Sequence, residues 1–83
     1  MTLGEFVARV ENEFDGQLSQ EIILTPNGEE QLRYLFREFE DGEVRFAVLP
    51  NIGEGDYLTP TVLNQLCRTL DLPVSEFGFV ARL

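Results

Sequence analysis

The sequence predicts an α+β fold in the order α-β-β-β-α, with a three-stranded antiparallel sheet and two helices packed on one face of it. Two observations lead to this prediction. Apolar residues recur at helical spacing near both ends of the chain, and the segment between them alternates with period two and contains two tight-turn signals. A chain of 83 residues can enclose one hydrophobic core, so residues 1–83 are predicted to form a single domain.

The first helix is expected over residues 3–15. Thr2 and Glu5 have the spacing of a capping box, in which the hydroxyl and the carboxylate each satisfy a free backbone N–H at a helix start. Gly16 is placed to end this helix. The apolar residues at helical spacing between these two signals are Leu3, Phe6, Val7, Val10 and Phe14.

Three strands are expected at residues 21–25, 31–39 and 43–49, joined as a meander. Pro26-Asn27-Gly28 and Asp41-Gly42 are strong turn signals between these β-rich runs. A helix over residues 29–40 is the competing interpretation, because the run from Glu29 to Arg33 consists of good helix formers. The tight Asp41-Gly42 turn favours strands.

A second helix is expected to begin at Thr59-Pro60 and to end before Pro73. Threonine can cap a helix, and proline suits the first helical position because the N–H that it lacks would be unpaired there. The apolar stripe of this helix consists of Val62, Leu63, Leu66 and Leu70. Beyond it, Ser75-Glu76-Phe77 can open a last turn, and the alternation of Phe77, Phe79, Ala81 and Leu83 is typical of a short strand or a packed tail.

Charge and composition restrict the classes of function. The net charge is −9, and all six basic residues are arginines. This charge repels phosphate, so RNA is a disfavoured partner and no membrane partner is expected. Solubility is the simplest explanation of the acidity, and an acidic mimic of nucleic acid that inhibits a DNA- or RNA-binding protein is an alternative.

Cysteine and histidine usage excludes further classes. The chain has one cysteine, Cys67, and no histidine, so no internal disulfide and no zinc site built from imidazole and thiolate ligands can form. We therefore expect no metal and no cofactor. Because the sequence has neither a basic leader with an apolar run nor a stretch of ~20 apolar residues, the expected location is cytoplasmic.

The second half of the chain resembles a known family. Val48-Leu49-Pro50 is followed by a polar loop with glycines, by Leu58-Thr59-Pro60-Thr61-Val62-Leu63, and by the run from Leu66 to Phe77. This succession is similar to the corresponding part of HicA-type toxins, small bacterial mRNA-cleaving proteins of toxin–antitoxin pairs. The resemblance implies a fold like that of double-stranded-RNA-binding domains.

The family's catalytic motif is not present in this chain. In HicA-type toxins a Gly-Ser-His-like motif opens the second strand, and its imidazole serves RNA cleavage. Here the region reads Asn27-Gly28-Glu29-Glu30-Gln31-Leu32-Arg33-Tyr34. The resemblance therefore implies that the catalytic function has been lost or replaced, and an RNA-cleaving toxin with a site free of histidine would contact RNA through Arg33, Tyr34 and Arg37.

The alternation of side chains along the sheet provides the candidate site. On one face we expect a set that packs under the helices, namely Leu32, Tyr34 and Phe36 of the second strand with Val44, Phe46 and Val48 of the third. On the opposite, exposed face we expect arginines interleaved with apolar residues. That face comprises Arg33, Leu35, Arg37 and Phe39 of the second strand with Arg45, Ala47 and Leu49 of the third.

Arginine beside apolar surface is enriched at binding interfaces, so we assign partner binding to Arg33, Leu35, Arg37, Phe39 and Arg45. Two alternatives remain open. These arginines can form cross-strand ion pairs with nearby glutamates on a solvated face, or they can contact RNA.

No catalytic constellation is visible in the sequence. Cys67 lies beside the apolar stripe of the second helix without a histidine to activate it, which indicates a structural thiol. Glu54 and Asp56 lie in a Gly-rich loop that could hold a hard cation, but their spacing does not match a calcium loop. We therefore expect a small non-catalytic interaction module that binds a protein partner, or itself as a homodimer, through the arginine-rich sheet face.

Overall fold

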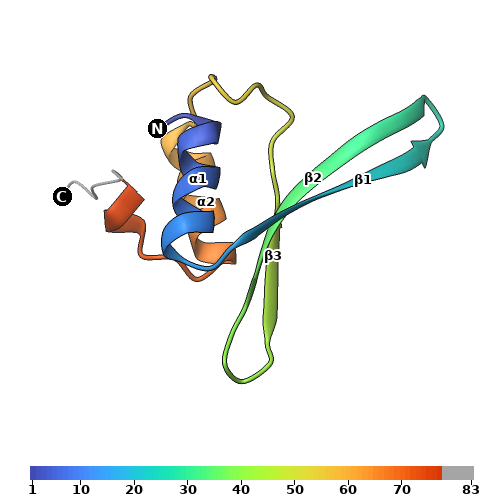
Figure 1. Ribbon diagram of the computed structural model, residues 1–83. Helices are drawn as coiled ribbons and strands as arrows, with labels where there is room; N and C mark the ends of the chain where they lie inside the picture. The colour runs from blue at the N-terminus through green and yellow to red at the C-terminus, as the bar shows by residue number, and fades with distance from the viewer. Residues whose placement is uncertain (78–83) are drawn as a thin grey trace.

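The computed structural model describes residues 1–77 and has the element order expected from the sequence. The strands form one antiparallel sheet in the order β1-β2-β3, and both helices lie on the same side of it (Figure 1). The α+β class is confirmed, whereas the alternation at Phe79, Ala81 and Leu83 lies outside the described residues. The elements are α1 Leu3–Glu13, β1 Gln17–Thr25, β2 Gly28–Glu38, β3 Val44–Val48, α2 Pro60–Thr69 and a 3₁₀ turn, η1 Val74–Phe77.

Local capping signals determine where both helices begin. At α1 the Glu5 N–H donates to the Thr2 hydroxyl at 3.1 Å, and the Thr2 N–H donates to the Glu5 carboxylate at 2.9 Å, which confirms the capping box. The hydrogen bond from the Thr2 backbone holds the pKa of Glu5 below its usual value. At α2 the Thr59 hydroxyl accepts the Val62 N–H at 3.2 Å, with Pro60 in the first turn.

Both helices end at an aspartate in the left-handed region. Asp15 has a φ of 55° and Asp71 a φ of 54°, each one residue beyond the C-cap. The left-handed position at the end of α1 is therefore occupied by Asp15 and not by Gly16. Gly16 serves a close approach instead, because its N–H donates to the Val10 carbonyl at 2.9 Å and a Cβ on it would lie 2.2 Å from Val10 Cγ1.

This close approach leads to a stability prediction. We expect Gly16→Ala to lower the free energy of unfolding by about 1–3 kcal/mol, because Val10 is fully buried and cannot move away from the added methyl group. Urea denaturation measures the change. Gly55→Ala is the matched control, since nothing lies within 4 Å of that Cβ position. Equal stabilities of the two variants would contradict the prediction.

The β1–β2 hairpin is longer than expected and extends beyond the helices (Figure 1). Pairing runs from Gln17 with Phe36 to Thr25 with Gly28, which leaves only Pro26 and Asn27 as the loop. The competing helix over residues 29–40 is not formed. The outer part of this hairpin exposes Ile22 and Leu24 of β1.

None of the helices within residues 1–77 has the length and the apolar character of a membrane span.

The hydrophobic core lies between the helix pair and the sheet. The sheet contributes Leu35, Ala47 and Leu49 to the core, and the other buried apolar side chains are Leu3, Phe6, Val10, Leu58, Leu63, Leu66, Cys67, Leu70, Leu72 and Phe77.

Candidate protein-binding surface

The sheet presents to the helices the face opposite to the one expected from the sequence. Leu35, Ala47 and Leu49 are buried, although they were assigned to the exposed face. The set assigned to the core points away from the helices, and in it Phe46 is 61% exposed. Period-two alternation was therefore identified correctly, but the assignment of its two faces is wrong.

The arginines of the predicted site bind the protein's own backbone. Arg33 donates to the Ile52 carbonyl at 3.0 Å, and Arg37 donates to the Phe14 carbonyl at 3.0 Å. The Arg37 guanidinium also donates to the carbonyls that follow α2 and lies 4.8 Å from the centre of the Phe39 ring. These guanidinium groups therefore form hydrogen bonds within the fold and are not directed toward a partner.

The five residues assigned to partner binding do not form one exposed surface. Leu35 is buried, Arg33, Arg37 and Phe39 are half-buried, and Arg45 is exposed and forms an ion pair with Glu43 at 2.8 Å. The set expected to contact RNA is divided as well, because Tyr34 alternates with Arg33 along β2 and lies on the opposite side of the sheet from both arginines.

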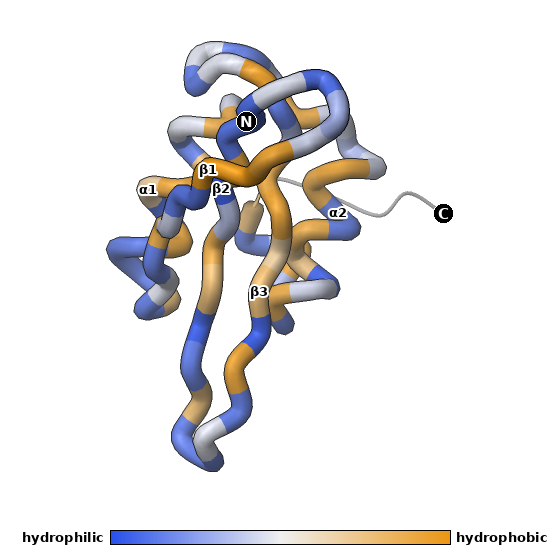
Figure 2. Tube along the Cα trace, turned by 90° about the vertical axis from the view of Figure 1, so that its right-hand side faces the viewer, coloured by the Kyte–Doolittle hydropathy of each residue, from blue (hydrophilic) through white to orange (hydrophobic). Residues whose placement is uncertain are grey.

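The face turned away from the helices is apolar, with its β3 side chains exposed and its β2 side chains half-buried. We call it the outer face and define it by six side chains: Leu32, Tyr34, Phe36, Val44, Phe46 and Val48. Its aromatic rings form a cluster, with ring centres 6.2 Å apart for Tyr34 and Phe36 and 6.3 Å apart for Tyr34 and Phe46. Figure 2 views the molecule with the sheet in front of the helices, and β3 is mostly apolar in colour.

Beside the outer face, one edge of β3 has no partner strand among residues 1–77. Paired residues in an antiparallel ladder alternate between those that exchange hydrogen bonds and those that do not. The Leu49 N–H donates to the Arg33 carbonyl at 2.9 Å, which places every second residue of β3 in hydrogen bonding with β2. The other residues of β3 direct their N–H and C=O groups away from β2, and they are Val44, Phe46 and Val48. No strand of the described part of the chain lies on that side.

A groove of about 500 Å³ runs along this edge, between β3 and α2. Val62 and Leu66 supply apolar side chains from the helix, and Gln65 and Thr69 supply polar ones. An extended chain beside β3 could therefore form hydrogen bonds with the β3 backbone and contact the apolar side chains of α2. Both kinds of contact are used when a peptide adds a strand to a sheet edge.

A smaller hollow of about 280 Å³ lies on the outer face itself, lined by Glu21, Leu32, Tyr34, Phe46 and Val48. The Tyr34 hydroxyl donates to the Glu21 carboxylate at 3.3 Å, so a charged group from β1 borders a largely apolar depression. Glu30 and Glu38 share this side of the sheet. Within residues 1–77 no arginine shares it, so the local charge is negative.

Comparisons with protein-family models, with curated proteins and with solved structures gave no match. The candidate surface therefore rests on the geometry of this chain alone.

The candidate groups for chemistry have structural roles. Cys67 is fully buried in α2, and burial raises the pKa of its thiol, which disfavours the reactive thiolate. The Asp56 carboxylate accepts the Gly53 N–H at 2.8 Å and so closes the loop that was considered for a cation. Within residues 1–77 there is no group of three acidic, cysteine or histidine side chains that could hold a metal ion.

Sequence reasoning missed the outer face although its residues were identified. The sequence contained a signal for it. Two of the six outer-face residues are the β2 aromatics Tyr34 and Phe36, and the alternate positions of β2 and β3 carry arginines. An arginine can cover apolar surface with its stem while its head reaches a carbonyl, so it can lie beneath a helix as readily as in solvent.

Proposed function

We propose that the protein is a non-catalytic interaction module that binds a protein partner through the outer face. The exposure of that face supports the proposal most directly. Val44, Phe46 and Val48 are 52%, 61% and 51% exposed on a strand whose other side is already packed against the helices. Contiguous exposed apolar side chains on a small domain are typical of an interaction site.

The free edge of β3 indicates how a partner would bind. The three residues that expose apolar side chains also direct their backbone groups to the free edge. A partner strand placed there would satisfy these groups and bring its own alternate side chains beside the exposed ones, so affinity would come from the backbone and specificity from the side chains. Strand addition at β3 is therefore the binding mode that we propose.

The test is photo-crosslinking at single positions. Replacing Phe46 by p-benzoylphenylalanine in the cell that naturally makes the protein is expected to give discrete adducts after irradiation. Tyr57 is the matched control, because it is an aromatic residue that is 74% exposed and lies in the loop before α2, paired with Thr2. The same replacement at Tyr57 is expected to give none of these adducts.

Mass spectrometry of the adducts identifies the partner, and an adduct of twice the chain's own mass would identify a second copy. The absence of adducts from position 46, or the same adducts from positions 46 and 57, would refute the proposed function.

A further inference from the structure

Within residues 1–77 the charges are arranged so that no cation lies on the outer face. Arg33, Arg37 and Arg45 belong to the two strands that build the outer face, yet all three alternate onto the helix side or its margin. Two of them donate to backbone carbonyls and the third pairs with Glu43. The aromatic residues of the outer face therefore have no positive neighbour among the described residues.

The hollow on the outer face combines the two groups that recognise a guanidinium. The Tyr34 and Phe46 rings both line the hollow and are inclined to each other at 70°. Glu21 adds a carboxylate at the margin, already oriented by the Tyr34 hydroxyl. Aromatic faces attract cations, and a carboxylate adds charge-assisted hydrogen bonds to an arginine fork.

The size of the hollow suits a side chain. Its volume of about 280 Å³ lies just below the range of pockets that hold small-molecule ligands. Leu32 and Val48 line it together with the rings, so the methylene stem of a long side chain would contact apolar surface while its charged head reached Glu21.

We propose that this hollow binds an arginine side chain from a segment of the partner protein. The inference rests on the proposed function and specifies the chemistry of the partner, which is a basic segment with apolar residues. Charge complementarity supports this occupant over a second copy, because two chains of net charge −9 would bring like-charged faces together.

The test uses a defined probe on the full chain. The probe is an N-acetylated, C-amidated peptide of alternating valine and serine with one central arginine, and its control is the same peptide with citrulline, which has the same shape without the charge. In an NMR titration we expect the amide signals of Glu21, Tyr34 and Phe46 to shift. The citrulline peptide should bind about fivefold to tenfold more weakly, which is the usual size of such a charge-dependent contact.

Two variants with the same net charge distinguish binding at the hollow from non-specific electrostatic attraction between the peptide and the acidic protein. Glu21→Gln and Glu11→Gln each remove one negative charge, but Glu11 is an exposed residue of α1, far from the outer face in sequence and on the other side of the sheet. We expect Glu21→Gln to weaken binding of the arginine peptide about fivefold and Glu11→Gln to leave it within about twofold.

Equal binding of the two peptides, equal effects of the two variants, or the absence of shifts at the hollow would each overturn the inference. The proposed function would survive any of these results if photo-crosslinks from position 46 still identify a partner. It would fail independently if those crosslinks are absent.

Discussion

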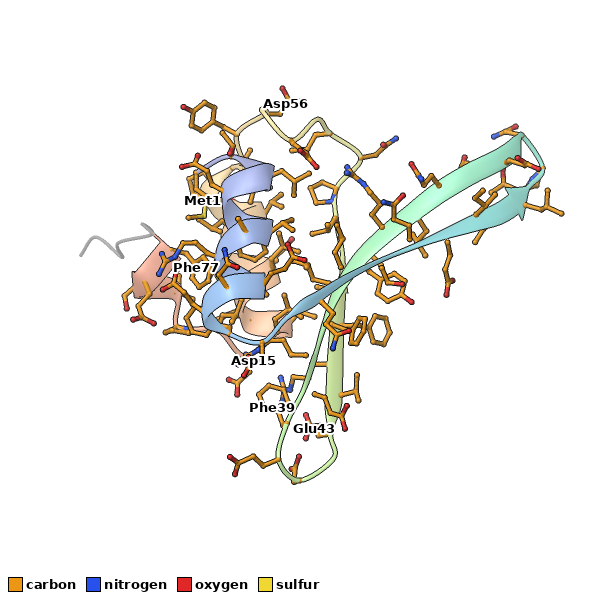
Figure 3. The ribbon with its side chains drawn as sticks, viewed as in Figure 1. Met1, Asp15, Phe39, Glu43, Asp56 and Phe77 are labelled. Carbon is orange, nitrogen blue, oxygen red and sulfur yellow. The ribbon has the colours of Figure 1, made fainter. Side chains whose placement is uncertain are left out.

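Replacing Phe77 by alanine is expected to lower the free energy of unfolding by about 3–5 kcal/mol. Phe77 is 1% exposed, and its ring centre lies 5.2 Å from that of Phe6 and 5.5 Å from that of Phe14. The Arg9 guanidinium lies over the same ring, 4.8 Å from its centre. Figure 3 shows Phe77 directed from η1 toward α1. Alanine would therefore leave a cavity bounded by aromatic rings and remove the ring beneath Arg9.

Such a loss is a large part of the stability of a small domain, which commonly totals about 5–15 kcal/mol. Phe46→Ala is the matched control, because it removes the same side chain from a position that is 61% exposed. We expect it to cost less than about 1 kcal/mol. Urea denaturation of both variants measures the difference. If Phe46→Ala proved the more destabilising change, the outer face would have to be part of a core, and the assignment of the two sheet faces would be refuted.

The elements that the sequence predicted best are those fixed by neighbouring residues. The capping box of Thr2 and Glu5, the Thr59-Pro60 start of α2 and the Asp41-Gly42 turn each depend on interactions within a few residues, and each is found in the structure. Strand limits were less accurate. Polar residues such as Gln17 and Glu29 join the β1–β2 ladder because pairing with the other strand, rather than their own propensity, places them there.

The assignment of the sheet faces failed for a different reason. Alternation divides a strand into two sets but does not say which set the helices cover, and here both sets contain large apolar residues. The arginine-bearing set was wrongly assigned to the solvent side because arginine was expected to face solvent. On the helix-facing side Arg33 reaches the Ile52 carbonyl in the loop before α2, and Arg37 reaches the carbonyl at the end of α1, so both arginine stems lie along the sheet at the margins of the core. No local pattern reveals the carbonyls that those stems reach, because they are brought together only by the fold.

Arg37 shows what that arrangement achieves, and its replacement is expected to have the second large effect. Its guanidinium donates to the Phe14 carbonyl at 3.0 Å and to the Leu70 carbonyl, and these residues are the C-caps of α1 and α2. It also donates to the Asp71 carbonyl at 2.9 Å. The last carbonyls of a helix lack intrahelical partners and carry the negative end of the helix dipole. One cation from the central strand therefore holds both helix ends against the sheet.

We expect Arg37→Ala to lower the free energy of unfolding by about 2–4 kcal/mol, because it leaves part-buried carbonyls without a charged donor and removes the guanidinium stacked on Phe39. Arg37→Lys should recover only part of this loss, since an ammonium group cannot reproduce the planar fork. Arg68→Ala removes an equal charge from an exposed position on α2 and is expected to stay within about 0.5 kcal/mol of the wild type. Should Arg37→Ala be as mild as Arg68→Ala in urea denaturation, water would have to satisfy these carbonyls equally well. The orientation of the sheet would then depend on the burial of Leu35, Ala47 and Leu49 rather than on the arginine between the helix ends.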